Sequence, residues 1–530
     1  MVPSLTGLLP RVADVPVKLD YDCNSGTSSS ATMHQSFQKD NRIVPLGIML
    51  LTCIFFVYHF ALVRGSLDGR RMTAAPNTFF ESSQHGNLDP DADANHAGEA
   101  VDEPVYNDIT SPGSSAMPPV TYSSPSHLPN GLTIDDVVLM FKTGATVLWK
   151  RVPIHIATTF SSHRINSNNL LLYSDYPETI GKLEFIDVLS NSSEQVRKSA
   201  SFQLYLQQED YESRQNYAEL SNLPGDGSGP IGGWKLDKYK FLPMFQHAGR
   251  NKPNAKWYIF MEDDSYIFLP NLLRHLDKFN HKDPWYLGSL AWKHGDYFAH
   301  GGSGIVLSRG AWEKSFGKDS GIVQKFEKFA EEHGCGDHVL GHVLHEYGVE
   351  FGETADDDRF RYGFNSEAHW SAWYERNNWC KPVYSWHHTH GKDVARYYEI
   401  EQSWDFEKGP LRYRDIYEAL VAPYLRPRAE WWNNGASQYE IESGVAAGVE
   451  PPSSVKSTET WRSAWMSVDA CEAACISWAD CVQWASYDDS CKMDSRVFLG
   501  SGIPEGDSRR QTSLPWVSGW LSRRLENWSC

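Results

Sequence analysis

Residues 257–268 read Trp-Tyr-Ile-Phe-Met-Glu-Asp-Asp-Ser-Tyr-Ile-Phe. The continuous aromatic and aliphatic run predicts a strand that is covered on both faces of a sheet. Three carboxylates, Glu262, Asp263 and Asp264, follow this run directly. In open α/β sheets, ligands bind at the carboxyl ends of such strands, and crowded acids repel one another unless a cation lies between them. The stretch therefore predicts a site for Mg²⁺ or Mn²⁺, although a solvated acidic turn would give the same pattern.

Strand-like and helix-like segments alternate around this stretch. Short apolar runs at 137–141, 170–173 and 183–188 predict strands, and 234–245 and 269–279 have the apolar spacing of helices. This alternation predicts a layered α/β domain with a mainly parallel sheet flanked by helices.

The first 130 residues have a different composition. Residues 43–63 contain no Lys, Arg, Asp or Glu and are long enough to cross a bilayer, so we expect a single transmembrane anchor after a cytosolic tail at 1–42. Residues 64–130 are rich in Ser, Pro, Asp, Asn and Gly, which predicts a disordered stem. The net charge of −18 argues against binding to nucleic acid, because no basic stripe is available to neutralise phosphates.

Cysteines are concentrated near the C-terminus. Seven of the nine follow residue 63, and four of these lie between 471 and 491, which favours disulfides and an oxidising compartment. The Gly-, Ala-, Ser- and Pro-rich segment 436–456 predicts a linker, and 457–530 predicts a small α+β module with a helix at 467–476 followed by a hairpin. Cys335 and Cys380 could pair, leaving Cys530 free for an intermolecular bond; a disulfide-linked and a non-covalent homodimer are both left open.

Several motifs occur in one recognisable order. They are the turn at 142–144, the acid triplet at 262–264, His-Gly-Gly-Ser-Gly at 300–304, Cys-Gly-Asp-His-Val-Leu-Gly at 335–341 and Ser-Trp-His-His at 385–388. Over residues 131–435 this order resembles glycosyltransferase family 31, the Fringe-like and core 1 β1,3-galactosyltransferase-like group, and in particular its fungal branch. Residues 457–530 separately resemble a PAN/Apple module.

The family resemblance implies a GT-A fold and a type II membrane protein of the Golgi or ER with its catalytic domain in the lumen. It also implies Mn²⁺ as the cofactor and a UDP-sugar as the donor of a hexose or N-acetylhexosamine. The sugar would pass with inversion to a glycan or glycoprotein acceptor, and the resemblance implies that the new linkage is β1,3. In the C-terminal module, resemblance implies the pairs Cys471–Cys491 and Cys475–Cys481.

The resemblance also assigns roles to individual residues. Asp264 and Glu262 are the expected metal ligands, and His387 is the expected third, with His388 as the alternative because the doubled histidine leaves the register open. Asp337 is the expected catalytic base, although a helix N-cap is the alternative role. The donor is expected to lie against six residues: Thr143, Asp175, Asp263, Gly301, Gly302 and Ser303.

Two departures from the family pattern keep other functions open. Glu262 stands where the family usually has Asp, and Gly336 stands where it has a first acid, so a catalytically inactive glycan- or protein-binding membrane protein is the alternative. A metal-dependent phosphodiesterase is a third hypothesis. The histidines at 338, 342 and 345 have a spacing that can bind zinc, but Val339 occupies the place of a zinc protease's glutamate.

Overall fold

The computed structural model describes residues 128–216, 233–351, 362–444, 446–511 and 514–530. The expected tail, the expected anchor at 43–63 and nearly all of the expected stem lie outside these residues. Within the described ranges, no helix is both long and apolar enough to cross a membrane.

The described residues contain a central sheet of seven strands. Its order is β3 (Glu178–Ile180), β4 (Leu183–Asp187), β2 (Leu170–Ser174), β1 (Val137–Lys142), β5 (Trp257–Glu262), β10 (Ile305–Ser308) and β7 (Tyr286–Gly288). Strands β4, β2, β1 and β5 are parallel, and β10 is antiparallel to both of its neighbours. The predicted mainly parallel sheet is confirmed, and the acid triplet lies at the carboxyl end of β5.

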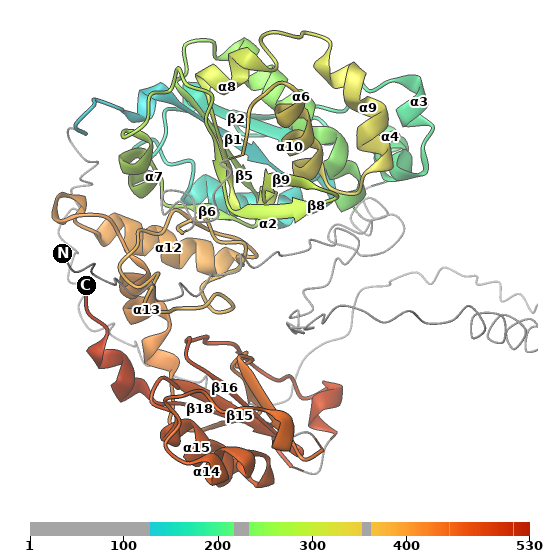
Figure 1. Ribbon diagram of the computed structural model, residues 1–530. Coiled ribbons are helices and arrows are strands. Elements are labelled where there is room, and N and C mark those ends of the chain that lie inside the picture. Colours follow the sequence, from blue (N-terminus) through green and yellow to red (C-terminus); the bar gives the residue numbers. More distant parts are fainter. Residues whose placement is uncertain (1–127, 217–232, 352–361, 445, 512–513) are drawn as a thin grey trace, which may run out of the picture. The chain divides into compact units, whose positions relative to one another are not determined.

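Helices cover both faces of this sheet (Figure 1). Val138 and Met140 of β1 belong to one core, with α6 (Trp234–Asn251), α9 (Ile322–Glu332) and α10 (Gly336–Glu346). Leu139 and Phe141 point the other way, into a second core with α2 (Ala145–Ala157) and α7 (Leu269–Leu276). The strands are therefore buried on both sides. The unbroken apolar run of β5 predicted this, because a strand buried on both faces needs apolar side chains on both. The shorter helices are α3 (Glu194–Arg197), α4 (Gln203–Ser213) and α8 (Arg309–Lys314).

Two small antiparallel ribbons lie outside the central sheet. In the first, β6 (Tyr266–Ile267) pairs with β11 (Ser385–Trp386), with Trp386 opposite Tyr266. The second is a hairpin of β8 (Leu290–Lys293) and β9 (Asp296–Ala299). Because β6 follows the acid triplet and β11 precedes His387, the first ribbon brings two distant parts of the chain together.

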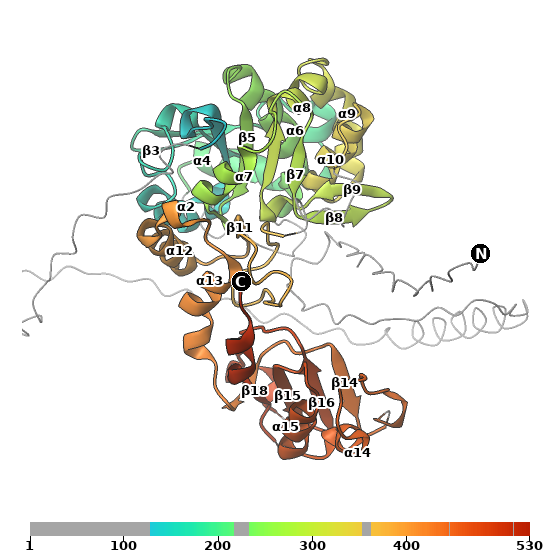
Figure 2. The ribbon, with the colours of Figure 1, turned by 60° about the vertical axis from the view of Figure 1, so that its left-hand side comes forward.

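The C-terminal part begins with α12 (Gly391–Ser403) and α13 (Tyr413–Leu420) and continues into a second sheet (Figure 2). In the described residues this sheet has the order β12 (Ala429–Glu430), β18 (Val517–Trp520), β15 (Gln483–Tyr487), β16 (Ser490–Asp494) and β14 (Tyr439–Glu442). A short ribbon joins β13 (Trp432–Asn433) to β17 (Ser501–Gly502). Helices α14 (Thr458–Arg462) and α15 (Val468–Ser477) precede the β15–β16 hairpin, as expected for this segment.

Part of the predicted linker is a strand. Strand β14 lies within 436–456 and pairs with β16, where Ile441 is opposite Cys491. The composition of this segment suggested a linker, but its Tyr-Glu-Ile-Glu stretch alternates between inward and outward side chains and completes the edge of the sheet.

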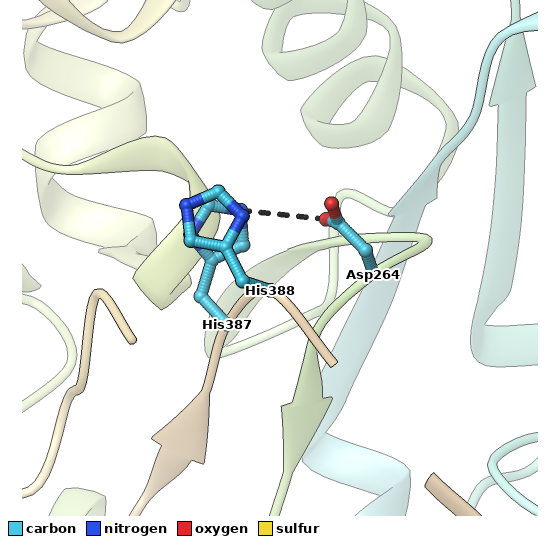
Figure 3. Close-up of side chains that lie close together, drawn as sticks. All are labelled: Asp264, His387 and His388. Carbon is cyan, nitrogen blue, oxygen red and sulfur yellow. Dashed lines mark ion pairs between the residues drawn. The ribbon is translucent and has the colours of Figure 1, made fainter. Parts of the chain in front are cut away.

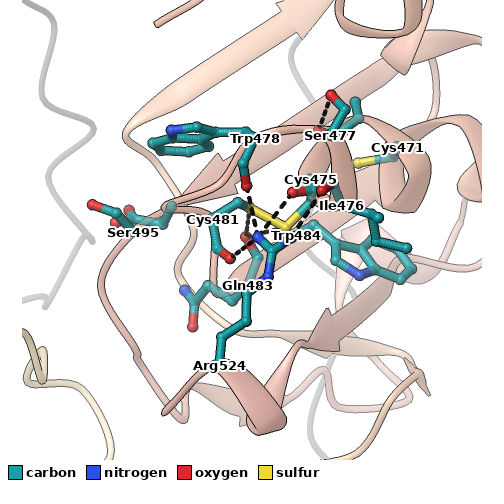
Figure 4. The surroundings of a disulfide bond; sticks show 12 residues. Cys471, Cys475, Ile476, Ser477, Trp478, Cys481, Gln483, Trp484, Ser495 and Arg524 are labelled. Atoms are coloured by element: carbon teal, nitrogen blue, oxygen red, sulfur yellow. Dashed lines mark hydrogen bonds between the residues drawn. A yellow bond between two sulfur atoms is a disulfide. The ribbon is translucent and has the colours of Figure 1, made fainter. Parts of the chain in front are cut away.

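The disulfides confirm one prediction and correct another. Cys471–Cys491 and Cys475–Cys481 are both present, and Arg524 donates hydrogen bonds to the carbonyl oxygens of Trp478 and Cys481 beside the second bond (Figure 4). Cys380 pairs with Cys530, so the expected Cys335–Cys380 bond and the free Cys530 are wrong. The end of the chain returns to this region, since Trp379 Nε1 donates to the carbonyl of Trp528 at 3.0 Å.

Candidate functional site

Glu262 is held by a buried lysine. Its Oε1 lies 2.9 Å from Nζ of Lys142, the last residue of β1, and the same Nζ lies 2.5 Å from Oδ2 of Asp237 on α6. The Lys142 side chain is only 5% exposed, so its charge requires these two carboxylates as partners. Glu262 therefore neutralises Lys142, and its carboxylate is not among the ligand atoms that converge at the site.

Asp263 anchors the turn that contains the acid triplet (residues 262–264), called the acid turn below. It is buried, it accepts a 2.6 Å hydrogen bond from the Thr143 hydroxyl, and it pairs with Nη1 of Arg151 at 2.7 Å. Burial raises the pKa of Asp263 to about 6, although the Arg151 charge opposes this rise. The two contacts tie the turn to the end of β1 and to α2.

Asp264 faces two histidines (Figure 3). Its Oδ1 lies 3.4 Å from Nε2 of His387, and Asp264, His387 and His388 each offer a ligand atom within 4.8 Å of the other two. The β6–β11 ribbon produces this convergence, and Thr389 N–H closes it by donating to the Asp264 carbonyl at 2.8 Å. Of the metal ligands expected from sequence, Asp264, His387 and His388 are thus brought together in space, whereas Glu262 contacts Lys142 instead.

The charges of this cluster depend on one another. Burial alone would lower the pKa of His387, but the Asp264 carboxylate raises it to about 9. Burial alone would raise the pKa of Asp264, but His387 and Arg151 hold it well below its ordinary value. In the absence of a metal ion, the Asp264 carboxylate is therefore neutralised by the His387 imidazolium, with Arg151 nearby.

The residues fit a divalent metal ion. Asp264 Oδ1 is buried, and its 3.4 Å contact with His387 is an ion pair without hydrogen-bond geometry, so among the described residues it has no hydrogen-bond donor. His387 Nδ1 lies 3.1 Å from the Ser366 carbonyl, so the ring can donate from Nδ1 and present Nε2 to an ion. One carboxylate oxygen and two imidazole nitrogens form a mixed set that suits Mn²⁺ better than Ca²⁺ or Mg²⁺. His388 has a left-handed backbone (φ 53°), a strained conformation that is common at functional sites.

Two glycines pack closely against the site residues. A Cβ on Gly302 would lie 2.2 Å from the His387 ring, and one on Gly301 would lie 3.4 Å from Cβ of Asp337. The Ser265 hydroxyl donates to the Gly302 carbonyl at 2.7 Å, which fixes the loop beside the acid turn. Ser303 is buried and its hydroxyl donates to the His300 carbonyl, so it shapes this loop.

Asp337 lies in the first turn of α10, on the other side of the glycine loop from His387. Its Oδ2 accepts the N–H of Gly301 and its Oδ1 accepts the N–H of His338, both at 2.8 Å. The N-cap of α10 is Cys335, so the alternative role of Asp337 as N-cap is wrong. Burial raises the pKa of Asp337 to about 6, although both hydrogen bonds oppose this rise. Such a carboxylate can accept a proton near neutral pH.

Asp175 has a local partner on each oxygen. It follows β2, accepts the Ala145 N–H at the start of α2 at 2.7 Å, and pairs with buried Lys240 of α6 at 2.9 Å. Lys240 also pairs with Asp237, so a chain of ion pairs built on two buried lysines runs from Asp175 to Glu262. Sequence reasoning missed Arg151 and the pairing in this chain, although Lys142 adjoins Thr143 and Asp237 stands three residues before Lys240 on one helix face.

The three histidines with zinc-like spacing do not converge on a metal site. His338 Nε2 and His342 Nδ1 both contact Oδ2 of Asp296, at 3.1 and 2.9 Å. His345 instead contacts Glu350 at 2.8 Å. Among the residues that the structure describes, the sole cluster with metal-binding geometry is that of Asp264, His387 and His388.

Comparison with known proteins gives one family match. Residues 132–355 match the model of the Fringe family, described as Fringe-like. The matched range contains the acid triplet, the glycine loop and Asp337, but it ends before His387 and His388. A search of the curated proteins found no relative. Residues 132–355 are therefore similar to a Fringe-like domain, which supports a glycosyltransferase family for this part of the chain.

Proposed function

We propose that this protein is an inverting, Mn²⁺-dependent glycosyltransferase. It would move a hexose or N-acetylhexosamine from a UDP-sugar to a hydroxyl of a glycan or glycoprotein and form a β1,3 linkage. The observation that carries the proposal is the convergence of Asp264, His387 and His388 at the carboxyl end of β5, within a Fringe-like domain.

Asp264, His387 and His388 would hold the ion. When bound, Mn²⁺ would neutralise the charge that develops on the diphosphate leaving group. Glu262 is left out of the ligand set because Lys142 already occupies its carboxylate. Thr143 and Asp263 lie beside the ion-binding residues and are proposed to line the donor site, whereas Asp175 would support it by fixing the start of α2 and Lys240.

Asp337 would act as the general base. It would take the proton from the acceptor hydroxyl as that oxygen bonds to the anomeric carbon of the donor. The bond from this carbon to the phosphate oxygen would break, and UDP would leave with the bonding electrons. The raised pKa and the position of Asp337 beyond the Gly301–Gly302 loop support this role.

The proposed setting is the lumen of the Golgi or ER, with the chain anchored as a single-pass type II membrane protein. The disulfide bonds in the described residues support an oxidising compartment. The C-terminal module, which resembles a PAN/Apple module, would be part of the lumenal portion.

A donor panel tests the proposal. The full chain in detergent is incubated with individual UDP-sugars and either Mn²⁺ or a chelator, and release of UDP is measured. We expect release with at least one UDP-sugar, only with metal, and none from Asp264→Asn. Asp337→Asn should retain UDP binding and lose transfer. Failure of the wild-type protein to bind UDP or release it from any donor would support the inactive binding protein instead.

A further inference from the structure

A short acceptor pattern for N-linked glycans follows strand β4. Residues 191–193 read Asn-Ser-Ser. This triplet has the form Asn-x-Ser/Thr, with x not Pro, that is glycosylated on asparagine in secreted proteins. It lies in a turn between β4 and α3, where the Ser192 N–H donates to the Leu189 carbonyl at 3.0 Å. Because such a short pattern also arises by chance, its surroundings decide whether it is a site.

The turn presents its asparagine to solvent and is held by its last serine. Asn191 is exposed. The Ser193 hydroxyl accepts the Val196 N–H at 3.3 Å and caps α3, and the Ser193 N–H donates to Oε1 of Glu327 on α9 at 2.9 Å. A group attached to Asn191 can therefore extend from the surface without displacing the contacts that fix the turn.

Asn191 also borders a cavity. The cavity has a volume of about 350 Å³ and lies between this turn, α6 and α9. Its wall combines apolar side chains with hydrogen-bonding ones, among them Val188, Leu242, Gln246, His247 and Val323. A sugar ring has apolar C–H faces and polar hydroxyl edges, so a wall with both kinds of group suits it.

We propose that Asn191 carries an N-linked oligosaccharide whose first sugar covers this cavity, an inference that rests on the lumenal setting of the proposed function. The donor is an oligosaccharide on a lipid diphosphate, and a lumenal transferase catalyses the step. Nδ2 of Asn191 bonds to C1 of the first N-acetylglucosamine and loses one proton. The bond from C1 to the phosphate oxygen breaks, and the lipid diphosphate leaves with the bonding electrons.

The glycan leaves the metal site open. In the sheet order, β2 and β1 lie between β4 and β5, the strand that ends in the acid triplet. Three strand spacings separate β4 from β5 by roughly 14 Å. Loss of the glycan should therefore expose the cavity and leave UDP release unchanged.

The first experiment maps the glycan by peptide mass spectrometry. The full chain is purified from a eukaryotic host and compared with Asn191→Gln, Ser193→Ala and Ser193→Thr. The threonine keeps both the acceptor pattern and a hydroxyl for the cap of α3, whereas alanine removes both. Asn251→Gln is the control, because Asn251 lines the same cavity outside any such triplet.

We expect a glycan on Asn191 in the wild type, in Ser193→Thr and in Asn251→Gln, and none at this position in the other two variants. Treatment with an amidase that releases N-linked glycans converts the modified asparagine to aspartate, which identifies the position by mass. Peptide mapping also separates Asn191 from a second triplet of this form at Asn527.

The second experiment tests where the first sugar lies. An endoglycosidase trims the wild-type chain to a single N-acetylglucosamine on Asn191, and diethyl pyrocarbonate then labels its histidines. His247, which lines the cavity, should react several-fold more slowly in this chain than in Asn191→Gln. His345, whose side chain is 57% exposed, should react equally in both. If Asn191→Gln does not fold, Ser193→Ala supplies the chain without a sugar at this position.

An unmodified Asn191 in the wild type would overturn this inference, and equal labelling of His247 in both chains would overturn the placement of the sugar. UDP release is measured on the same preparations, so the two proposals fail separately. A chain that is glycosylated at Asn191 but binds and releases no UDP would overturn the proposed reaction alone. A chain that releases UDP and has no glycan at Asn191 would overturn the modification alone.

Discussion

At the scale of single residues, the close approach of backbone and side chains matters as much as charge. Gly302 lies so close to the His387 ring that any side chain there would displace the ring. This contact explains why the motif has glycine at position 302: the space for a side chain is already taken by the His387 ring. Movement of the imidazole would separate its Nε2 from Asp264 and open the ligand set.

Gly302→Ala should therefore weaken Mn²⁺ binding. We expect an affinity loss of about 10-fold or more, as for other changes that misplace a metal-ligating histidine, with near-ultraviolet circular dichroism unchanged. Gly444→Ala is the matched control, because a Cβ at Gly444 would have nothing within 4 Å. Equal Mn²⁺ affinity in both variants would contradict the packing argument.

The pKa of Asp337 predicts how transfer depends on pH. Burial raises this pKa to about 6, and only the ionised carboxylate can accept the acceptor proton. Transfer should therefore be constant well above pH 6, fall to about half of its maximum near pH 6, and approach a tenfold loss per pH unit at lower pH. The measurement is kcat/KM for the acceptor between pH 5 and 8, at saturating metal and donor. A profile that is flat down to pH 5 would exclude Asp337 as the base.

Single residues were predictable where a motif fixes them, and not where a distant partner does. Asp264, His387 and Asp337 were identified from motifs, and the structure places them around one glycine loop. The role of Glu262 was not predictable, because Lys142 is a partner on a neighbouring strand. The Cys380–Cys530 bond was missed for the same reason, since sequence spacing does not determine connectivity.

At the scale of secondary-structure elements, periodicity predicted the long elements and missed the ribbon that completes the site. Strands β1, β2, β4 and β5 and helix α6 were expected from their apolar runs. Strands β6 and β11 have two residues each, too few for any period to appear, and their pairing joins distant parts of the chain. The sequence therefore predicted the strand that ends in the acid triplet, but not strand β11, which brings His387 and His388 next to Asp264.

Trp386 of β11 gives a test of this ribbon. Its side chain is fully buried against a core that includes Tyr266 and Tyr397. Trp386→Ala should lower the free energy of unfolding by about 3–5 kcal/mol, the usual cost of removing a buried aromatic side chain. Trp149→Ala, at a side chain that is 62% exposed, is the control and should change little. Denaturant unfolding followed by fluorescence compares them, and equal midpoints would contradict the packing described here.

At the scale of the whole molecule, the C-terminal module and the site share a core. Val497 and Trp520 belong to the same apolar cluster as Trp386 and Tyr266. Tyr374 and Val497 also exchange two backbone hydrogen bonds of 2.8 Å. Composition suggested a separate module after a linker, but composition cannot show that apolar residues on both sides of the linker pack together. We infer that the module stabilises the ribbon that carries His387.

The Cys380–Cys530 bond gives a test of stability at this scale. Its cysteines are 150 residues apart, and a disulfide that closes a long loop restricts the unfolded chain. Replacing both with Ser should lower the free energy of unfolding by about 2–4 kcal/mol and lower the melting temperature accordingly. Differential scanning calorimetry without reductant compares this variant with the wild type. Identical melting curves would show that the bond adds no stability.

Measurement of Mn²⁺ binding is the most direct test of the central claim. This claim is that Asp264, after β5, and the two histidines after β11 form one metal site. Electron paramagnetic resonance would count bound Mn²⁺ in the wild-type chain and in Asp264→Asn, His387→Ala and Glu262→Gln. The account predicts that the wild type binds the ion, that Asp264→Asn and His387→Ala lose it, and that Glu262→Gln retains it because Glu262 serves Lys142. Mn²⁺ binding that survives in both Asp264→Asn and His387→Ala, or its absence from the wild type, would contradict the account.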